Sequence, residues 1–551
     1  MIDFKLFQHP QRYIGNEWNV IKKSHNKRIP ICLCYPDSYE IGMSNLGLRI
    51  IYSLLNDSDD IVCERAFFPG EDFNNFLLNN NQKLFSLETK TPLANFEVLG
   101  FNFNYELNFV NFLYILSLAK IPLFSRARKD LIVLGGGIAN PESLADFVDV
   151  FYIGEFEAGT ASFIEVLRKY KDKKSRLEAL CEIEGFYVPA FYSAELKNDK
   201  YEFNKIYSYA KLPVKRTYVS NLDKSHYPLK WLTPHTAIVH DRVPIEIARG
   251  CPNRCTFCQA RAMYYPYREK KAETVCRIIR EIYKNSGYEN FSLLSLSSSD
   301  YSQIEELIDI LFAEFKQKRI GLALPSLRAD DILGKLYSKL HLLRKTSLTV
   351  AIESANDSLR NHIGKKIDIK KLFETARLIR TFNLKHIKLY FMIGFKEETE
   401  EDLRAIGLFL EKLNQETHLS LNVSINVFVP KPFSLREDAT MAEKDTLLDK
   451  INIVKNGLPK RRSINISISP VEKSILEAII SRADRKFSSV ILDVSKASCN
   501  NRNAAGNWLI WQEAMSKNHI DCAAYLKAET INFPWSFINT GLPECNLKKH
   551  E

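Results

Sequence analysis

The first 200 residues alternate between short apolar runs and segments in which apolar residues recur at helical spacing. The runs are brief and rich in β-branched residues, as buried strands are. They are Ile31 to Tyr35, Ile61 to Ala66, Val98 to Phe103, Leu131 to Leu134 and Val150 to Ile153. Because strands that alternate with helices usually pair in parallel, residues 1–200 are predicted to form a doubly wound parallel sheet.

Turn residues follow three of these predicted strands. Pro36-Asp37-Ser38 follows the first strand, Gly135-Gly136-Gly137 the fourth and Gly154-Glu155 the fifth. Ligands of doubly wound sheets bind outside the carboxyl ends of the strands, so Gly135, Gly136 and Gly154 are candidate ligand contacts. Turns that need a positive φ explain the same glycines nearly as well.

A second α/β array follows a polar connection, residues 201–241, which contains Pro213, Pro228 and Pro234 and is predicted to be a linker. Within residues 242–435 six strand-like runs are separated by segments with amphipathic helical patterns. The runs are Val243 to Ala248, Phe291 to Leu296, Gly321 to Leu324, Leu348 to Glu353, His386 to Ile393 and Leu421 to Val429. This pattern predicts a parallel βα array, two units short of a full eight-stranded barrel.

Residues 436–551 begin with a charged stretch and then show helical spacing in Val471 to Ser481 and in Leu509 to Met515. Trp508, Trp511 and Trp535 indicate a small packed C-terminal domain. Aromatic residues of this kind are more often part of a core than of a cofactor site, so we expect these three in a core.

The composition, 45% hydrophobic and 26% charged residues over 551 positions, is ordinary for a globular protein of roughly two to four domains. The longest apolar stretch, Phe109 to Phe124, is interrupted by Asn111, Lys120 and Pro122. It is shorter than the roughly 20 residues of a membrane span, so no membrane segment is expected. Eleven cysteines without a secretory leader predict a reducing, cytoplasmic location.

The formal net charge of +10 raises the question of an anionic partner such as RNA. The lysines and arginines are distributed along the chain, and short basic clusters such as Lys460-Arg461-Arg462 are typical of solvated faces. Nucleic acid is therefore not the partner that we expect.

Three cysteines, Cys251, Cys255 and Cys258, follow the first strand of the second array at C-x3-C-x2-C spacing, in a loop with Gly250 and Pro252. Thiolates favour zinc, Cu(I) or iron-sulfur clusters. A structural zinc site needs a fourth ligand at matched spacing, and none is nearby in the sequence. A cubane cluster held by three cysteines keeps one iron open to another ligand, which suggests chemistry. A zinc loop or three unrelated core thiols are the alternatives.

This spacing, with Phe257 just before the last cysteine, resembles the signature of radical S-adenosylmethionine (radical SAM) enzymes. The resemblance implies a 4Fe-4S cluster on the three cysteines, with the open iron chelating S-adenosylmethionine (SAM). It also implies reductive cleavage of SAM to a 5′-deoxyadenosyl radical, an electron donor such as flavodoxin or ferredoxin, and closure of the βα array into a partial (β/α)6 barrel.

Further positions at predicted strand ends match SAM contacts of this superfamily in part. Ser299 and Asp300 stand where many members have Gly-Gly-Glu at the SAM amino group. Glu353 ends the fourth strand, and Arg328 is a candidate partner of the SAM carboxylate because a guanidinium binds a carboxylate with two bonds. The resemblance also implies adenine contacts at Gly394 and Val429, although a tight turn explains Gly394 equally well.

The N-terminal segments resemble the Rossmann-like, cobalamin-binding-type domain that precedes the radical domain in one radical SAM class. The matching pieces are Ile41 to Gly47, Gly135-Gly136-Gly137 with Asn140-Pro141-Glu142, and Ile153-Gly154-Glu155. No Asp-x-His-x-x-Gly occurs here, so cobalamin bound without a protein histidine and a fold that has lost the cofactor are both open. Segments such as Leu324 to Asp330 and Phe428 to Pro432 resemble an uncharacterised bacterial radical SAM family with this domain, and Glu353-Ser354-Ala355-Asn356 departs from it.

Three functions follow from these observations. The first is a radical SAM enzyme that acts on an unknown substrate, with methyl transfer through cobalamin as one form of the reaction. The second is an RNA-modifying radical SAM enzyme, which the positive charge motivates although no RNA-binding module is recognisable. The third is a non-catalytic iron-sulfur or zinc-binding protein, which requires that the SAM-contact positions be accidental.

Overall fold

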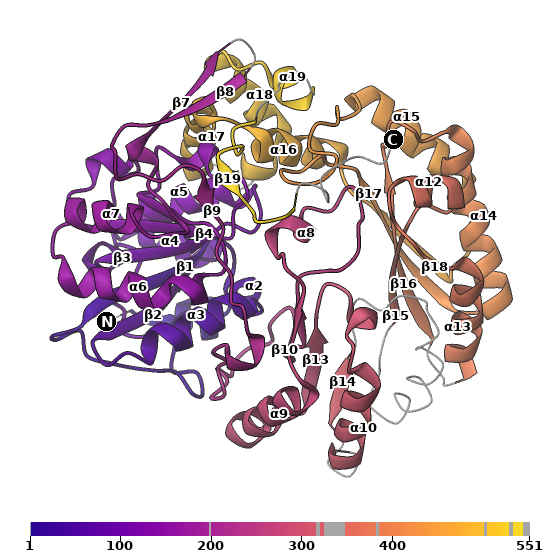
Figure 1. Ribbon diagram of the computed structural model, residues 1–551, viewed down its shortest axis with the longest axis horizontal. Helices are drawn as coiled ribbons and strands as arrows, with labels where there is room; N and C mark the ends of the chain where they lie inside the picture. The colour runs from indigo at the N-terminus through magenta and orange to yellow at the C-terminus, as the bar shows by residue number, and fades with distance from the viewer. Residues whose placement is uncertain are drawn as a thin grey trace.

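The computed structural model describes residues 2–197, 200–315, 320–323, 348–381, 385–500, 504–527 and 533–543. Its N-terminal part is a sheet with the order β2-β1-β3-β4-β5-β6, in which only β6 runs antiparallel to its neighbour (Figure 1). The strands are β1 Ile29–Tyr35, β2 Ile61–Phe67, β3 Val98–Asn102, β4 Ile132–Gly136, β5 Val150–Tyr152 and β6 Phe186–Tyr187. All five predicted strands are present, and the doubly wound parallel sheet is confirmed.

Helices cover both faces of this sheet, which explains why its strands are apolar on both sides. Helices α3 (Leu46–Asn56) and α6 (Phe156–Lys169) contact each other on one face. On the other face α4 (Glu71–Asn79) and α5 (Asn108–Leu118) are joined by the Tyr114 hydroxyl, which donates to Asn74 Oδ1 at 2.8 Å. Helix α17 (Ser488–Asn500) packs over α5, so α5 is buried on all sides and needs apolar residues around its whole circumference.

The second array forms two parallel sheets, β10-β13-β14 and β15-β16-β17-β18. The strands are β10 Val243–Glu246, β13 Asn290–Leu294, β14 Gly321–Ala323, β15 Leu348–Glu353, β16 His386–Ile393, β17 Ser420–Val427 and β18 Ile464–Ile468. The six predicted strands lie at the predicted places, which confirms the partial βα barrel. Strand β18, beyond residue 435, adds a parallel strand that was not predicted.

Helices alternate with these strands as a βα array requires. They are α9 Ala272–Ser286, α10 Ile304–Phe315, α12 Asp357–His362, α13 Ile369–Thr381, α14 Glu400–Thr417 and α15 Lys444–Gly457. Figure 1 shows α13, α14 and α15 along the outer side of the four-stranded sheet. Helix α14 begins with a capping box, in which the Thr399 and Asp402 side chains accept hydrogen bonds from each other's backbone N–H groups.

The first predicted strand of the barrel changes direction at its end. After β10 the chain forms β11 (Ala248–Arg249), which pairs antiparallel with β12 (Arg268–Glu269). The three-cysteine segment and the short helix α8 (Ala260–Met263) lie between these two strands. The hairpin base therefore closes a loop of fixed length around the cysteines.

Residues 201–241, predicted to be a linker, are packed against both ends of the chain. Strand β8 (Lys200–Lys205) forms a hairpin with β7 (Tyr192–Lys197), and β9 (Val214–Lys215) pairs with β19 (Ile538–Asn539). Trp231 is buried under the guanidinium of Arg49, whose carbon lies 4.3 Å from the ring centroid. This segment is thus an ordered connection that joins the N-terminal sheet to the C-terminal residues.

The C-terminal residues form the helices α16 (Val471–Arg482), α17, α18 (Trp508–Lys517) and α19 (Cys522–Leu526). Trp511 and Trp535 are fully buried and Trp508 packs at the core margin, as expected of core aromatics. Among the described residues no helix has both the length and the apolar character needed to cross a membrane.

Candidate functional site

The three cysteines lie on the loop formed by residues 250–259, whose first residue is a glycine with a backbone conformation that the loop requires. Gly250 has φ +87°, and a Cβ there would lie 2.7 Å from the Tyr264 carbonyl oxygen and 2.8 Å from that of Pro266. Only glycine tolerates both the backbone conformation and the contact. Cys251, Cys255 and Cys258 are each half-buried, so their thiols are shielded yet accessible.

Burial sets the protonation of the thiols in the metal-free protein. It raises the pKa of Cys255 to about 11, and the neighbouring Cys258 and Cys251 add to the rise while the Lys365 ammonium opposes it. Burial likewise raises the pKa of Cys258, and Cys251 adds to that rise. The three thiols are thus electrostatic neighbours, and a metal that binds them must displace their protons.

The donor set suits an iron-sulfur cluster by its chemistry. Cys251, Cys255 and Cys258 are three free thiols on one half-buried loop, and thiolates are the ligands that such clusters take. Among the described residues no three His, Cys, Asp or Glu side chains are arranged as the ligands of a single metal ion.

The cysteine loop is anchored to both sheets of the barrel. Asn253 Nδ2 donates to Asp300 Oδ2 at 2.7 Å and lies 3.4 Å from Cys251 Sγ, which ties the loop to the end of β13. Thr256 N donates to the Ile363 carbonyl at 2.9 Å, which ties it to the end of α12. Gly364 packs so closely that a Cβ would lie 2.5 Å from the Arg254 carbonyl oxygen.

Ser299 and Asp300 lie where the sequence placed them, in a short 3-10 turn (Ser298–Asp300) after β13. The Asp300 carbonyl accepts a hydrogen bond from the Tyr267 hydroxyl at 2.9 Å, and the Asp300 carboxylate accepts one from Asn253 of the cysteine loop. Asp300 therefore lies beside the cysteines, as the predicted SAM contact requires. Arg328 lies outside the described residues.

Glu353 ends β15 in a strained conformation. Its φ is +67°, and the pairing of β15 with β16 shifts register between Ala351 and Glu353. Its side chain is buried, which raises its pKa, and its charge contributes to the raised pKa of Cys255. A non-glycine residue at positive φ costs of the order of 1 to 3 kcal/mol and is commonly found at functional sites.

Two basic residues near the cysteines were not predicted from the sequence. Lys365 Nζ lies 3.9 Å from Glu353 Oε1 and opposes the rise in the pKa of Cys255 and Cys258. Arg261, on α8, is buried, which lowers its pKa, while the charges of all three cysteines oppose that shift. Neither residue belongs to a motif that would mark it in the sequence. Lys365 in particular comes close to the loop only because of the way α12 folds.

The remaining predicted SAM contacts of the barrel are Phe257, on the cysteine loop, and Gly394 and Val429, which follow β16 and β17. Gly394 has φ +99°, and its N–H donates to Glu398 Oε2 at 2.8 Å, so a turn accounts for this glycine. Phe257 packs on a small apolar cluster formed by Leu359, Ile363, Phe395 and Phe428. Val429, half-buried, follows Phe428 at the end of β17. These residues form an apolar wall next to the cysteines.

The predicted N-terminal ligand contacts differ among themselves. At Gly135 a Cβ would meet the rings of Phe151 and Phe103 at 2.7 and 2.8 Å, and at Gly154 it would meet the Thr217 carbonyl oxygen at 2.2 Å. Both glycines therefore serve internal packing. Gly136 faces open space, since the nearest atom to its Cβ position is 4.0 Å away.

The strand order places the ligand crevice of this sheet between β1 and β3, where the chain reverses direction. At the end of β3 the Oδ1 atom of Asn102 is buried and has no hydrogen-bond partner within the described part of the chain. The atom lies beside Gly137, which follows β4. A buried acceptor is costly without a donor, so this atom suits a hydrogen-bond donor of a ligand at the ends of β3 and β4.

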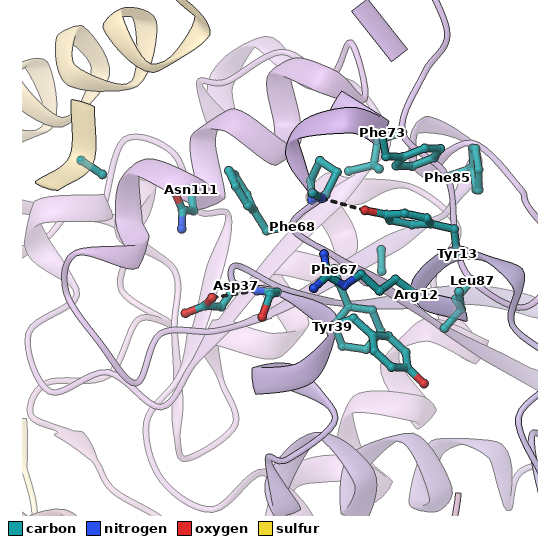
Figure 2. A pocket seen from close by; sticks show the side chains of 16 residues that line it. Arg12, Tyr13, Asp37, Tyr39, Phe67, Phe68, Phe73, Phe85, Leu87 and Asn111 are labelled. Carbon is teal, nitrogen blue, oxygen red and sulfur yellow. Dashed lines mark hydrogen bonds between the residues drawn. The ribbon is translucent and has the colours of Figure 1, made fainter. Parts of the chain in front are cut away.

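A separate cavity of about 380 Å³ lies at the ends of β1 and β2. Figure 2 shows Tyr13, Phe73 and Phe85 on one side of it and the Arg12 side chain reaching in beside Phe67. Arg12 Nε binds Glu40 Oε1 at 2.5 Å, and Tyr13 accepts a hydrogen bond from Gly70 N at 2.9 Å. None of the predicted site residues lines this cavity.

Comparison with known proteins agrees with this arrangement. The model of the radical SAM superfamily matches residues 245–410, and a model described as the N-terminal domain of radical SAM proteins matches residues 47–189. The chain belongs to the radical SAM superfamily, and the sequence resemblance to it is confirmed.

Particular relatives span different shares of the chain. An uncharacterized protein of Methanocaldococcus jannaschii is 27% identical over 85% of this chain and 91% of its own length. The ribosomal protein uS12 methylthiotransferase RimO of Thermoanaerobacter sp. is 21% identical over 50% of this chain and 67% of its own.

A solved structure has a similar fold over most of the chain. It is the radical SAM methyltransferase TsrM of Kitasatospora setae, solved with cobalamin and a [4Fe-4S] cluster bound. The TM-score is 0.54 at 11% identity, covering 89% of this chain and 100% of that one. The likeness shows a shared fold that includes the N-terminal sheet.

Proposed function

We propose that this protein is a radical SAM enzyme in which Cys251, Cys255 and Cys258 hold a 4Fe-4S cluster. The observation that carries the proposal is a half-buried loop of three thiols, anchored to both sheets of a partial barrel. With a cluster held there and reduced by an external electron donor, one electron would be available to cleave SAM to methionine and a 5′-deoxyadenosyl radical.

Charged residues around the loop match the charges of SAM. The methionine part of SAM carries an ammonium and a carboxylate, which need an anion and a cation beside the cluster. Asp300 offers a carboxylate after β13 and Glu353 offers one at the end of β15, and Lys365 offers an ammonium 3.9 Å from Glu353. Glu353 and Lys365 in this way hold SAM in orientation, while Phe257 and its apolar cluster exclude water from one side.

Anaerobic reconstitution with iron and sulfide tests the ligand assignment. The wild type should bind about four irons and four sulfides per chain and, when reduced by dithionite, cleave SAM slowly without substrate. A variant with all three cysteines replaced by alanine should lose the cluster, whereas a Cys522→Ala variant should keep it because Cys522 lies in the separate helix α19. An unchanged iron content in the triple variant would disprove the assignment.

The N-terminal sheet supports a second part of the proposal, cobalamin bound without a protein histidine and used for methyl transfer. At the ends of β3 and β4, Asn102 Oδ1 lies beside Gly137 and has no hydrogen-bond partner among the described residues, and a Cβ at Gly136 would have no atom nearer than 4.0 Å. Asn102 would accept a hydrogen bond from the amide groups that cobalamin carries. Contacts of cobalamin with Gly135 and Gly154 stay a prediction, because both glycines pack against the protein itself.

Cobalt analysis tests this second part. The full-length protein, purified anaerobically and mixed with hydroxocobalamin, should retain cobalt through gel filtration. Asn102→Leu should retain less, while the Asn95→Leu control, before β3, should retain as much as the wild type. No retained cobalt in the wild type would make the N-terminal domain a cap or a substrate-binding domain, without affecting the assignment of the three cysteines.

A further inference from the structure

Strands β17 and β18 alternate strictly between apolar and polar residues. Along β17 the apolar Leu421, Val423, Ile425 and Val427 are buried, and the residues between them are half-buried or exposed. The pattern continues on β18, where Asn465 and Ser467 are exposed. One face of this parallel sheet is thus apolar and the other carries amides and hydroxyls.

The apolar face is covered by helices. Phe391 of β16 lies on that face, and its ring centroid is 6.0 Å from that of Phe409 in α14. Met392, the next residue, points to the opposite face and packs against the apolar cluster to which Phe257 belongs. The polar face therefore lies on the side of the cysteine loop, away from α13, α14 and α15 (Figure 1).

Six residues on the polar face pair across β17 and β18, and we refer to them as the amide ladder. Asn465 Nδ2 donates to Asn422 Oδ1 at 3.3 Å, and the hydroxyls of Ser424 and Ser467 lie 3.3 Å apart. A third rung is formed by Ser469 Oγ, which donates to Asn426 Oδ1 at 2.6 Å. Within the described part of the chain, the amide nitrogens of Asn422 and Asn426 donate to no protein group, so the ladder keeps donors for another molecule.

A polar face is unusual for this architecture. Parallel sheets are normally covered on both faces by apolar layers, and the interior of a βα barrel is normally filled by branched aliphatic side chains. Asparagine and serine at these positions would weaken such a core. They suit a surface that exchanges hydrogen bonds with water in the free protein and with a polar ligand in the complex.

The spacing of the ladder indicates the class of that ligand. Successive rungs are two residues apart along β17, which is about 6.6 Å. An extended polypeptide repeats its own amide groups with the same period, so each rung can face one amide of a bound chain. The six ladder residues carry no charge, and Lys388 of β16, which pairs with Asn422, places one cation beside them on the same face. A single cation is far fewer than the row of lysines and arginines that binds a phosphate backbone.

Building on the proposed function, we propose that the amide ladder binds an extended peptide segment of the substrate along β17, with its amides bound to Asn422 and Asn426. The radical would then act on the part of the peptide nearest the cysteine loop, beyond the carboxyl end of β17. This assigns the substrate to the class of peptides or proteins.

The test uses the full-length protein, reconstituted anaerobically with its cluster and saturated with SAM. It is mixed with a defined pool of end-blocked synthetic octapeptides and, separately, with a pool of neutral oligosaccharides, and retained molecules are quantified by mass spectrometry after rapid filtration. We expect the wild type to retain a subset of the peptides. The N422A/N426A variant should retain them about tenfold less, since two neutral hydrogen bonds are lost.

The control is N79A/N80A, which removes two exposed asparagines from the end of α4, far from the barrel, and should retain peptides like the wild type. If circular dichroism shows that N422A/N426A is not folded, N465A on the edge strand β18 replaces it. Retention of no peptide by the wild type, retention of oligosaccharides alone, or equal retention by wild type and variant would each overturn the proposal. Wild-type SAM cleavage without peptide is measured in parallel, so a failure of the proposed function is seen separately.

Discussion

Replacing Glu155 with alanine should destabilise the junction between the N-terminal sheet and the cysteine loop. The Glu155 carboxylate is buried and bound by three guanidinium groups, those of Arg216 at 3.0 Å, Arg249 at 2.8 Å and Arg268 at 2.7 Å. Arg249 and Arg268 are paired across β11 and β12, and Arg249 directly precedes Gly250 of the cysteine loop. Glu155 therefore holds the base of that loop against the N-terminal domain.

The size of the effect follows from which cations lose their partner. Removing one member of a buried ion pair costs about 3 to 5 kcal/mol, because the remaining charge is uncompensated. Arg249 keeps Glu246 and Glu157, so its loss is partial. Arg216 and Arg268 have no other carboxylate partner within the described residues. We therefore expect a loss of about 3 to 5 kcal/mol and a lower iron content after reconstitution.

The assay is urea unfolding followed by circular dichroism, together with iron analysis. Glu195→Ala is the control, since Glu195 pairs with Lys197 at 2.8 Å but both side chains are more than half exposed. Exposed pairs contribute little, so this variant should unfold like the wild type. If E155A unfolds at the same urea concentration as E195A and keeps its iron, the assigned role of Glu155 is wrong.

The same carboxylate predicts a pH dependence. Burial alone would raise the pKa of Glu155, but the hydrogen bond from Arg268 and the charges of Arg249 and Arg268 outweigh it and bring the pKa below the usual 4.5. A carboxyl whose pKa is lower in the folded state stabilises the fold above its unfolded pKa and loses this effect as the pH falls through the folded value. The wild type and E155A should thus differ most near pH 7 and converge below pH 4.5.

Two further predictions concern the loop and SAM. E353Q and K365M should each raise the Kd for SAM, measured by equilibrium dialysis, by roughly ten- to a hundred-fold, because charge-assisted contacts contribute on the order of 1.5 to 3 kcal/mol. K366M, at the exposed neighbouring position, is the control and should leave the Kd unchanged, so equal affinities in all three variants would remove both roles. G364A should lower iron content and stability more than G287A. Both glycines have φ +71°, but only at Gly364 would a Cβ meet a backbone oxygen, at 2.5 Å. Similar losses in the two variants would show that φ alone matters.

Periodicity predicted the strands well because buried parallel strands are short apolar runs whatever surrounds them. It did not predict β18, although Ile464 to Ile468 alternates between apolar and polar residues as a half-buried strand does, because the segment is short and lies beyond residue 435, the predicted end of the array. The linker prediction rested on prolines. In the structure Trp231 and Tyr227 of this segment are buried. Local composition does not reveal that burial.

The candidate site divides in the same way. The cysteines, Asp300 and Glu353 could be found because each has a chemical signal or a strand end next to it. Lys365 could not, because its place beside Glu353 depends on α12 turning back at Gly364 toward the cysteine loop. The glycines at 135 and 154 are ambiguous from the sequence, since the same residue type serves a ligand or a close internal contact. The structure shows the internal contacts, with Phe151 and Thr217, and the ligand contacts stay a prediction.

The cysteine loop has contacts with every part of the chain, and this constrains how the protein works. Its base is tied to Glu155 in the N-terminal domain and its middle to Asp300 after β13 and to Ile363 after α12. Its end is tied to the Pro432 carbonyl, to which Gln259 Nε2 donates at 3.2 Å. Lys431, next to Pro432, pairs with Glu106 at 2.6 Å and with Glu477 of α16 at 2.8 Å. A ligand that shifts the N-terminal sheet therefore acts on the loop at both of its ends, through Arg249 and through Lys431. Occupation of the crevice between β1 and β3 is for this reason expected to alter the cluster environment even where the ligand does not touch the cluster.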